Sequence, residues 1–162
     1  MELLSYADEV ARLADALRAL GWRIATAESC TGGAIAAACT AMAGSSDWFN
    51  RGFVTYSNEA KVEMLGVEAA LIGRVGAVSE EVALAMVRGA LARSPAQLAV
   101  AVTGIAGPGG AVPGKPVGTV WLAWGDAAHV EAERLQLGGD RDAVRAATVR
   151  RALQRLIERA RS

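Results

Sequence analysis

Two lysines stand out in this chain, because they are the only lysines among seventeen basic residues: Lys61 and Lys115. Arginine stays protonated at every pH a protein normally meets, whereas burial can lower the pKa of a lysine until its amine acts as a base. A lysine that persists among arginines is therefore a candidate for acid–base chemistry, and Lys61 is the stronger of the two. The alternative is that a preference for arginine left two lysines by chance.

Ser29 lies in the segment AESCTGG at 27–33, which has the composition of a tight turn between a strand and a helix. Small residues there can present free backbone amides at a helix N-terminus, where negative charge is favoured. Such amides could stabilise the oxyanion of an acyl intermediate formed on Ser29. The alternative is that Ser29 and Thr31 only cap the helix. Cys30 competes as a nucleophile, but we expect it to pack as a small apolar residue.

A serine nucleophile needs a base, and the single histidine, His129, is poorly placed to serve. His129 alternates with Glu131 and Glu133 in the polar phase of an expected strand, so it should face solvent. A neutral lysine replaces histidine in serine–lysine sites. Lys61 is therefore the candidate base.

The segment VTYSNEAK at 54–61 leads from an expected strand end to Lys61 on the following helix. Tyr56 at that strand end could relay a proton or hold the hydroxyl of the nucleophile, although a tyrosine packed in the core is the commoner case. The alternative for Lys61 is a surface ion pair with Glu59 or Glu63, which would keep the lysine charged.

The segment TGIAGPGG at 103–110 follows a continuous apolar run. Glycines allow backbone amides to approach a ligand closely, and α/β folds bind ligands beyond the carboxyl ends of their strands. A phosphate or a ribose is the natural ligand for this loop. The segment matches neither the Walker A nor the GxGxxG pattern, so it could equally be a turn-rich connection.

Composition narrows the class of protein. A length of 162 residues fits a single domain over 1–162, and seventeen acidic residues balance seventeen basic ones. We therefore expect no nucleic-acid partner, and a small-molecule ligand instead. The uncharged run at 97–114 is interrupted by glycine and proline, and the first residues lack the pattern of a signal peptide, so we expect a soluble, cytoplasmic protein without a membrane partner. Two cysteines nine positions apart indicate neither a disulfide framework nor a metal site.

Hydrophobic periodicity predicts alternating helices and strands. Strands are expected at 22–27, 49–56, 98–102, 117–124 and 128–137, and the last two should form a hairpin with a bulge near 133–134. Helices are expected at 3–20, 34–43, 58–65, 79–93 and 140–161, with Ser57 and Asp140 as N-caps. This order predicts a three-layer α/β/α sandwich with a central mixed β-sheet, in which the strand at 98–102 is central.

Six segments in order resemble the CinA C-terminal domain family: AESCTGG at 27–33, VTYSNEAKVEMLGV at 54–67, GAVSEEVA at 76–83, TGIAGPGG at 103–110, KPVGTVW at 115–121 and GDRDAVRAATVRRAL at 139–153. The resemblance covers almost the whole chain. Nothing in the sequence resembles the amino-terminal molybdopterin-binding-like domain of the longer members.

The resemblance implies an amidohydrolase that converts nicotinamide mononucleotide to nicotinic acid mononucleotide and ammonia in pyridine nucleotide recycling, without a metal or another cofactor. It implies Ser29 as nucleophile, Lys61 as base and Tyr56 as the assisting hydroxyl, with Thr31, Gly32 and Gly33 around the oxyanion. The implied substrate-binding residues are Thr103, Gly104, Ala106, Gly107, Gly109, Gly110 and Arg145, the last facing the 5′-phosphate. A non-catalytic nucleotide-binding or interaction module of the same fold is the alternative function, and a homo-oligomer such as a dimer is left open.

Overall fold

The computed structural model describes residues 1–162 and contains one five-stranded sheet, ordered β2-β1-β3-β4-β5. Its strands are β1 (Ile24–Glu28), β2 (Phe49–Val54), β3 (Leu98–Gly104), β4 (Thr119–Gly125) and β5 (Val130–Gln136). β1 runs parallel to both β2 and β3, whereas β4 and β5 are antiparallel to their neighbours. The mixed sheet, the central place of β3 and the β4–β5 hairpin are confirmed.

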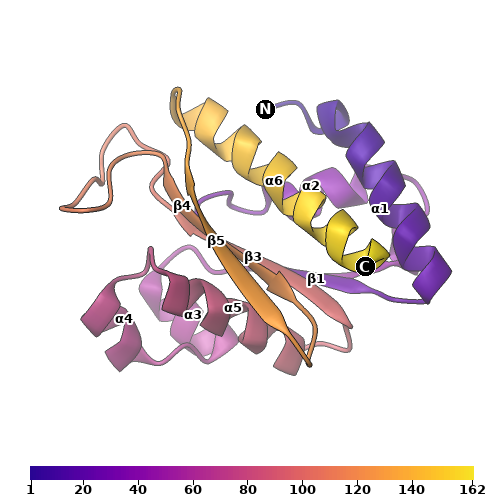
Figure 1. Ribbon diagram of the computed structural model, residues 1–162, viewed down its shortest axis with the longest axis horizontal. Helices are drawn as coiled ribbons and strands as arrows, with labels where there is room; N and C mark the ends of the chain where they lie inside the picture. Colours follow the sequence, from indigo (N-terminus) through magenta and orange to yellow (C-terminus); the bar gives the residue numbers. More distant parts are fainter.

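Helices cover both faces of this sheet, as Figure 1 shows. α1 (Ala7–Leu20), α2 (Ala34–Thr40) and α6 (Arg141–Arg161) lie on one face, and α3 (Asn58–Leu65), α4 (Ala69–Val75) and α5 (Glu80–Ala92) lie on the other. Short 3-10 turns at Leu3–Tyr6 and Ser45–Asp47 complete the elements. The predicted α/β/α sandwich is confirmed. None of the helices combines the length and apolar character that a membrane span requires.

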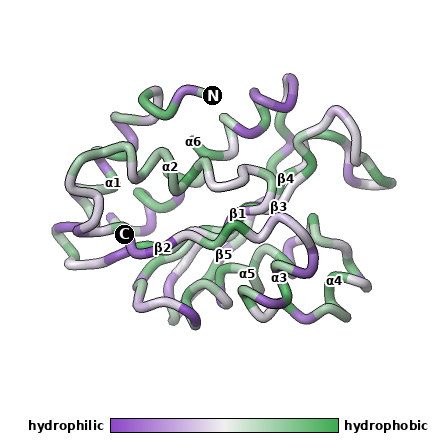
Figure 2. Tube along the Cα trace, turned by 180° about the vertical axis from the view of Figure 1, so that it is seen from behind, coloured by the Kyte–Doolittle hydropathy of each residue, from purple (hydrophilic) through white to green (hydrophobic).

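The core consists of two apolar clusters, one on each face of the sheet. Leu98, Val100 and Val102 of β3 belong to the larger cluster under α1, α2 and α6, whereas Ala99 and Ala101 belong to the smaller one under α5. β3 is therefore buried on both faces, which explains its uninterrupted apolar sequence. Figure 2 shows apolar residues recurring along the strands and helices that enclose these clusters.

Close packing of α3 against α5 places Lys61 inside the protein. A Cβ atom added at Gly89 of α5 would lie 2.1 Å from the carbonyl oxygen of Leu65, so only glycine lets the end of α3 approach so near. α3 begins at its predicted cap, where the Ser57 hydroxyl accepts a hydrogen bond from the Ala60 amide, and it ends at Gly66 in the left-handed conformation. The predicted helix at 58–65 is confirmed.

The bulge predicted near 133–134 is wrong, because β4 and β5 pair without a register shift from Thr119–Gln136 to Gly125–Val130. The apolar residues of β5 change sides without a change in backbone register. Val130 and Ala132 pack on the α5 side of the sheet, whereas Leu135 packs on the α6 side. An edge strand between two helical layers can thus contribute apolar side chains to both faces.

Candidate active site

The carboxyl ends of three parallel strands meet at one edge of the sheet. β1 lies between β2 and β3, so the residues after Glu28, Val54 and Val102 lie beside one another. The ladder continues past β1, because the Ser29 amide donates to the Val102 carbonyl at 3.1 Å and the Thr55 amide donates to the Glu28 carbonyl at 2.8 Å. Ser29 therefore has a fixed backbone at the point where strand order reverses, a position typical of ligand sites in α/β folds.

Lys61 reaches this strand edge from α3 and is 1% exposed. Its Nζ atom lies 3.0 Å from Ser29 Oγ, 2.8 Å from the Thr55 carbonyl oxygen and 3.2 Å from the Tyr56 carbonyl oxygen. No carboxylate lies within ion-pair distance of Lys61. The alternative of a surface ion pair with Glu59 or Glu63 is therefore wrong.

The three neighbours of the Lys61 amine can all accept from an ammonium group, and they also suit a neutral amine. Such an amine has two N–H donors and one lone pair, and the two carbonyls at Thr55 and Tyr56 can accept only from the donors. The lone pair is then left for the Ser29 hydroxyl, which can donate its proton to Nζ. Burial lowers the pKa of Lys61, against a smaller opposing effect of Cys30, and so favours this neutral form.

Cys30 is a weaker candidate for the nucleophile than Ser29. Its side chain is buried, and this burial raises the pKa of the thiol to about 12. A thiol with that pKa holds its proton at neutral pH and is a weak nucleophile. The expectation that Cys30 packs as a small apolar residue is confirmed by its place in the larger core cluster.

A buried carboxylate, Glu28, occupies the N-terminus of α2. It accepts hydrogen bonds from the Ile35 amide at 2.9 Å, the Ala36 amide at 3.0 Å and the Thr31 hydroxyl at 2.5 Å. The first-turn amides of α2 are thus already paired with a negative charge. Sequence reasoning missed this role, although a glutamate just before a strand-to-helix turn is its signal.

The turn after Ser29 contains the remaining amides. The Gly32 amide is engaged with the Ser29 carbonyl at 3.0 Å, so it does not face a ligand as expected. The amides of Cys30, Thr31 and Gly33 donate to no group in the protein. Of these three residues only Cys30 lines the cavity beside Ser29. The unpaired amide at the cavity is therefore that of Cys30, nearer to Ser29 than the two glycines.

A cavity of about 230 Å³ opens over Ser29 and Lys61. Six of its lining residues are among those predicted from the sequence: Ser29, Tyr56, Lys61, Thr103, Gly104 and Ala106. The other five were missed: Cys30, Asn58, Ala77, Val78 and Arg141. Thr103 is buried and its hydroxyl donates to the Ala77 carbonyl at 3.0 Å, so it holds the cavity wall together.

Tyr56 contributes to this site differently from expectation. Its carbonyl contacts Lys61, but the residue is 61% exposed and its hydroxyl accepts from Arg141 Nη2 at 3.3 Å. The expected contact between this hydroxyl and Ser29 is not formed. Arg141 also donates from Nη1 to the Gly107 carbonyl at 2.9 Å, which places its guanidinium at the rim of the cavity.

Arg145 is not at the cavity, contrary to its predicted contact with a phosphate. Its Nε and Nη2 atoms donate to the carbonyls of Cys30 and Thr31 at 3.2 and 3.1 Å. α6 makes one turn between residues 141 and 145, and Arg141 is the residue that lines the cavity. The later loop glycines, Gly109 and Gly110, are exposed and do not line the cavity either.

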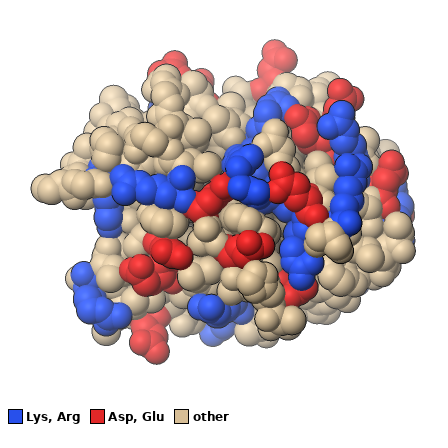
Figure 3. Space-filling model, in the orientation of Figure 1, with Lys and Arg blue, Asp and Glu red and all other residues tan.

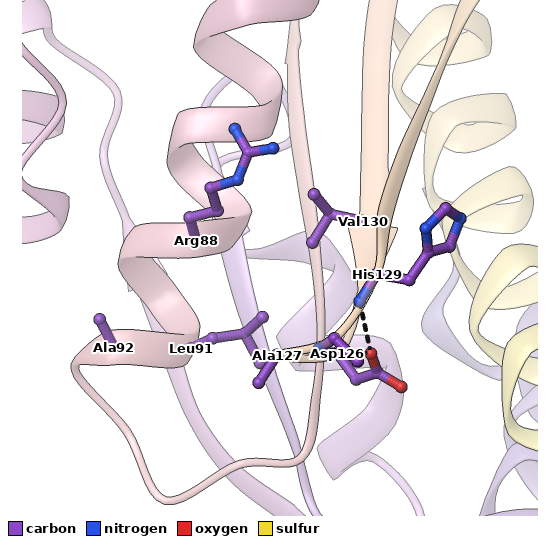
Figure 4. Close-up of a pocket in the computed structure, with 8 residues that line it drawn as sticks. Arg88, Leu91, Ala92, Asp126, Ala127, His129 and Val130 are labelled. Atoms are coloured by element: carbon purple, nitrogen blue, oxygen red, sulfur yellow. Dashed lines mark hydrogen bonds between the residues drawn. The ribbon is translucent and has the colours of Figure 1, made fainter.

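A larger hollow of about 520 Å³ lies between α5 and the β4–β5 turn, but it lacks converging polar groups. Figure 4 shows the side chains of Asp126 and His129 directed away from its apolar wall at Leu91 and Ala92. The His129 side chain is 63% exposed and lies 3.8 Å from Glu131, so its expected solvent-facing position is confirmed. The cavity at Ser29 is the better candidate for chemistry.

The chain is similar to known proteins along nearly its whole length. The sequence model of the protein family described as the CinA C-terminal domain matches residues 7–160 of this chain. A nicotinamide-nucleotide amidohydrolase of Pseudomonas putida is 58% identical over 147 residues, which cover 91% of this chain and 92% of the relative. A protein of the same name from Escherichia coli K12 is 49% identical over 156 residues, which cover 96% and 93% of the two chains.

Solved structures show the same fold. A competence/damage inducible protein of Agrobacterium tumefaciens superposes with a TM-score of 0.92 at 48% identity, covering 96% of this chain and 94% of the other. A CinA superfamily protein of Klebsiella pneumoniae gives a TM-score of 0.91 at 43% identity, with coverages of 95% and 96%. Shared sequence along nearly the whole length and a shared fold lead to one conclusion: the chain belongs to the CinA C-terminal domain family.

Proposed function

We propose that this protein is an amidohydrolase that hydrolyses the carboxamide of nicotinamide mononucleotide, releasing ammonia and nicotinic acid mononucleotide. The observation that carries the proposal is the buried Lys61 amine, 3.0 Å from Ser29 Oγ and without a carboxylate partner. The names of the relatives from Pseudomonas putida and Escherichia coli support the choice of substrate. The product would return to the pool of pyridine nucleotides from which NAD is made.

The first half of the reaction forms an ester on Ser29. Ser29 Oγ attacks the carboxamide carbon while Lys61 Nζ takes the hydroxyl proton, which gives a tetrahedral oxyanion and an ammonium group on Lys61. Lys61 then returns this proton to the amide nitrogen as the C–N bond breaks. Ammonia leaves, and the nicotinoyl group stays on Ser29.

The second half uses the same two residues with water. Lys61 takes a proton from a water molecule, the resulting hydroxide attacks the ester carbon, and the C–O bond to Ser29 breaks. The proton on Lys61 passes back to Ser29 Oγ. The enzyme is then regenerated with a carboxylate product, and no change of redox state occurs.

The nucleotide would lie with its pyridine ring inside and its phosphate outside. A cavity of about 230 Å³ is smaller than those that enclose a whole ligand of drug size, roughly 300–1,000 Å³. At its rim Arg141 is exposed and donates to an uncharged carbonyl and a phenol rather than to a carboxylate. Its charge is thus available for a phosphate.

Ser29→Ala tests the proposal directly. Ammonia release from nicotinamide mononucleotide should fall to background, whereas calorimetry should still detect binding of the nucleotide, because the cavity keeps its other walls. Ammonia release that survives this substitution would rule out Ser29 as the nucleophile. Binding without turnover in the unsubstituted protein would favour the alternative of a non-catalytic nucleotide-binding module.

A further inference from the structure

The two peptide groups after Cys30 Cα are held by one guanidinium. Arg145 Nε and Nη2 donate to two consecutive carbonyls, those of Cys30 and Thr31, at 3.2 and 3.1 Å. A trans peptide places its N–H opposite to its C=O. The amide of Thr31 and the amide of Gly32 therefore point away from Arg145 and from α6.

The amides of Thr31 and Gly32 differ in whether they already have a hydrogen-bond acceptor. The Gly32 amide closes the turn by donating to the Ser29 carbonyl at 3.0 Å, whereas the Thr31 amide has no acceptor in the protein. The Cys30 amide, next to the nucleophile, has none either. Because the Glu28 carboxylate takes the first amides of α2, these two unpaired N–H groups are the donors nearest in sequence to Ser29.

Arg145 has no carboxylate partner, as is also true of Arg141 and Arg161 on α6. Arg150, Arg151, Arg155 and Arg159 each pair with an aspartate or glutamate. Arg145 is half-buried, and its charge is directed at peptide dipoles alone. A positive charge at the carbonyl end of these peptides strengthens the partial positive charge on their N–H ends.

We propose that Arg145 is a positioning residue for the reaction on Ser29: by holding the carbonyls of Cys30 and Thr31 it fixes the turn at 30–32, so that the Cys30 amide, whose residue lines the cavity, receives the oxyanion. The proposal rests on the amidohydrolase function proposed above. It replaces the phosphate contact predicted for Arg145 from the sequence, and it assigns that contact to Arg141 one turn earlier.

The test compares Arg145→Ala with Arg151→Ala on the same helix. Arg145→Ala should lower kcat about 10-fold to 100-fold, somewhat less than the loss of an oxyanion donor itself, while KM changes less than about threefold. Guanidinium ion, added below its denaturing range, should restore part of kcat. Arg151→Ala removes an ion pair with Glu133 and should lower the thermal midpoint without a change in kcat.

A second measurement does not depend on turnover. In nitrogen–proton correlation spectra of the free protein, Arg145→Ala should shift the amide signals of Cys30 and Thr31 and accelerate their exchange with solvent. If the unsubstituted protein released no ammonia, the proposed function would fail, yet these spectra would still report whether Arg145 orients the turn. Unchanged amide signals together with an unchanged kcat would overturn the positioning role. A raised KM at constant kcat would instead indicate that Arg145 binds the phosphate of the substrate.

Arg145→Lys covers the case in which the alanine variant does not fold. Lysine keeps the charge but presents a single nitrogen, which cannot bridge two carbonyls with the fixed geometry of a guanidinium. We expect the kcat of Arg145→Lys to lie between that of the unsubstituted protein and that expected for Arg145→Ala, again with little change in KM. A lysine variant with full kcat would show that charge alone suffices and would contradict the bridging geometry.

Discussion

Two regions of this protein give their cationic side chains different partners. On the face that carries α6 and β5, Figure 3 shows basic and acidic side chains side by side. Glu133 there accepts hydrogen bonds from Arg151 and Arg155. Around Ser29, by contrast, Lys61 and Arg145 donate to neutral carbonyls and meet no carboxylate.

The difference follows from what each region does with charge. An ion pair stabilises the charged forms of both partners, and the hydrogen bond from Arg155 is the largest effect that lowers the pKa of Glu133 to about 2. A lysine that gives and takes a proton, as proposed for Lys61, needs surroundings that do not stabilise its charged form so strongly. Carbonyl groups orient the Lys61 amine, and they fix its protonated form less firmly than a carboxylate would.

Among substitutions in these two regions, Lys61→Arg should have the largest effect on activity. Arginine keeps the positive charge but cannot accept a proton, so ammonia release should fall about 10³-fold, within the range for loss of a general base. Lys115→Arg is the matched control. Lys115 donates to the Val75 carbonyl at 2.8 Å and does not line the cavity, so its substitution should change kcat/KM less than threefold. Near-normal turnover by Lys61→Arg would instead indicate that Lys61 is a charged contact to the ligand and not a base.

Arg141→Gln should have the next largest effect, and it should act on binding. Loss of a charge-assisted hydrogen bond to phosphate, worth about 1.5–3 kcal/mol, corresponds to roughly a 10-fold to 100-fold rise in KM for the nucleotide. Nicotinamide riboside, which lacks the phosphate, provides the internal control, because its turnover should be the same in both proteins. A fall in kcat at constant KM would place Arg141 in the chemical step.

The pH dependence of turnover should show a basic group with a lowered pKa. Burial lowers the pKa of Lys61, so its neutral form accumulates at lower pH than that of an exposed lysine, whose pKa is about 10.4. Below the lowered value kcat/KM should rise about tenfold per pH unit, and it should level off before pH 10.4. The measurement is initial-rate ammonia release over that range. A rate that continues to rise up to pH 10.4 would indicate an unperturbed lysine.

Glu133→Gln should have the smallest effect and should leave turnover unchanged. The folded pKa of Glu133 is about 2, below the value of roughly 4.3 for an exposed glutamate, so the carboxylate stabilises the fold above pH 4.3 and loses this contribution as pH falls toward 2. Removing its charge should lower the free energy of unfolding by about 1–2 kcal/mol at neutral pH. Denaturant unfolding of both proteins at neutral pH and near pH 3 measures this, and the difference should shrink at the lower pH.

Most of the fold could be predicted from the sequence because local signals agree with tertiary packing. The caps at Ser57 and Asp140 accept the amide hydrogen bonds expected of them, and the apolar run of β3 lies in the centre of the sheet. α4 was missed because it is only seven residues long and none of its residues is fully buried, although Leu71, Ile72 and Val75 pack partly buried against the smaller core cluster. Trp48 lies between the 3-10 turn at Ser45–Asp47 and β2, and it is fully buried in the core.

The site could be predicted only in part, because it depends on side-chain direction. Ser29 and Lys61 follow from residue type and position, and the structure brings them together. Whether Tyr56 turns its hydroxyl or its carbonyl toward Ser29 depends on the course of the chain between β2 and α3. Choosing between Arg141 and Arg145 requires the orientation of α6 relative to the turn after Ser29, which no local pattern contains.

The place of Ser29 between two parallel neighbours has a consequence for how such a protein can change over time. Ser29 and Lys61, the proposed nucleophile and base, are buried beside the central sheet, where an altered backbone would disturb the strands. Arg141 and Tyr56 lie at the exposed rim, where substitutions should change the stability of the fold little. Substitutions at the rim can therefore alter ligand binding while the fold that holds Ser29 and Lys61 together stays intact.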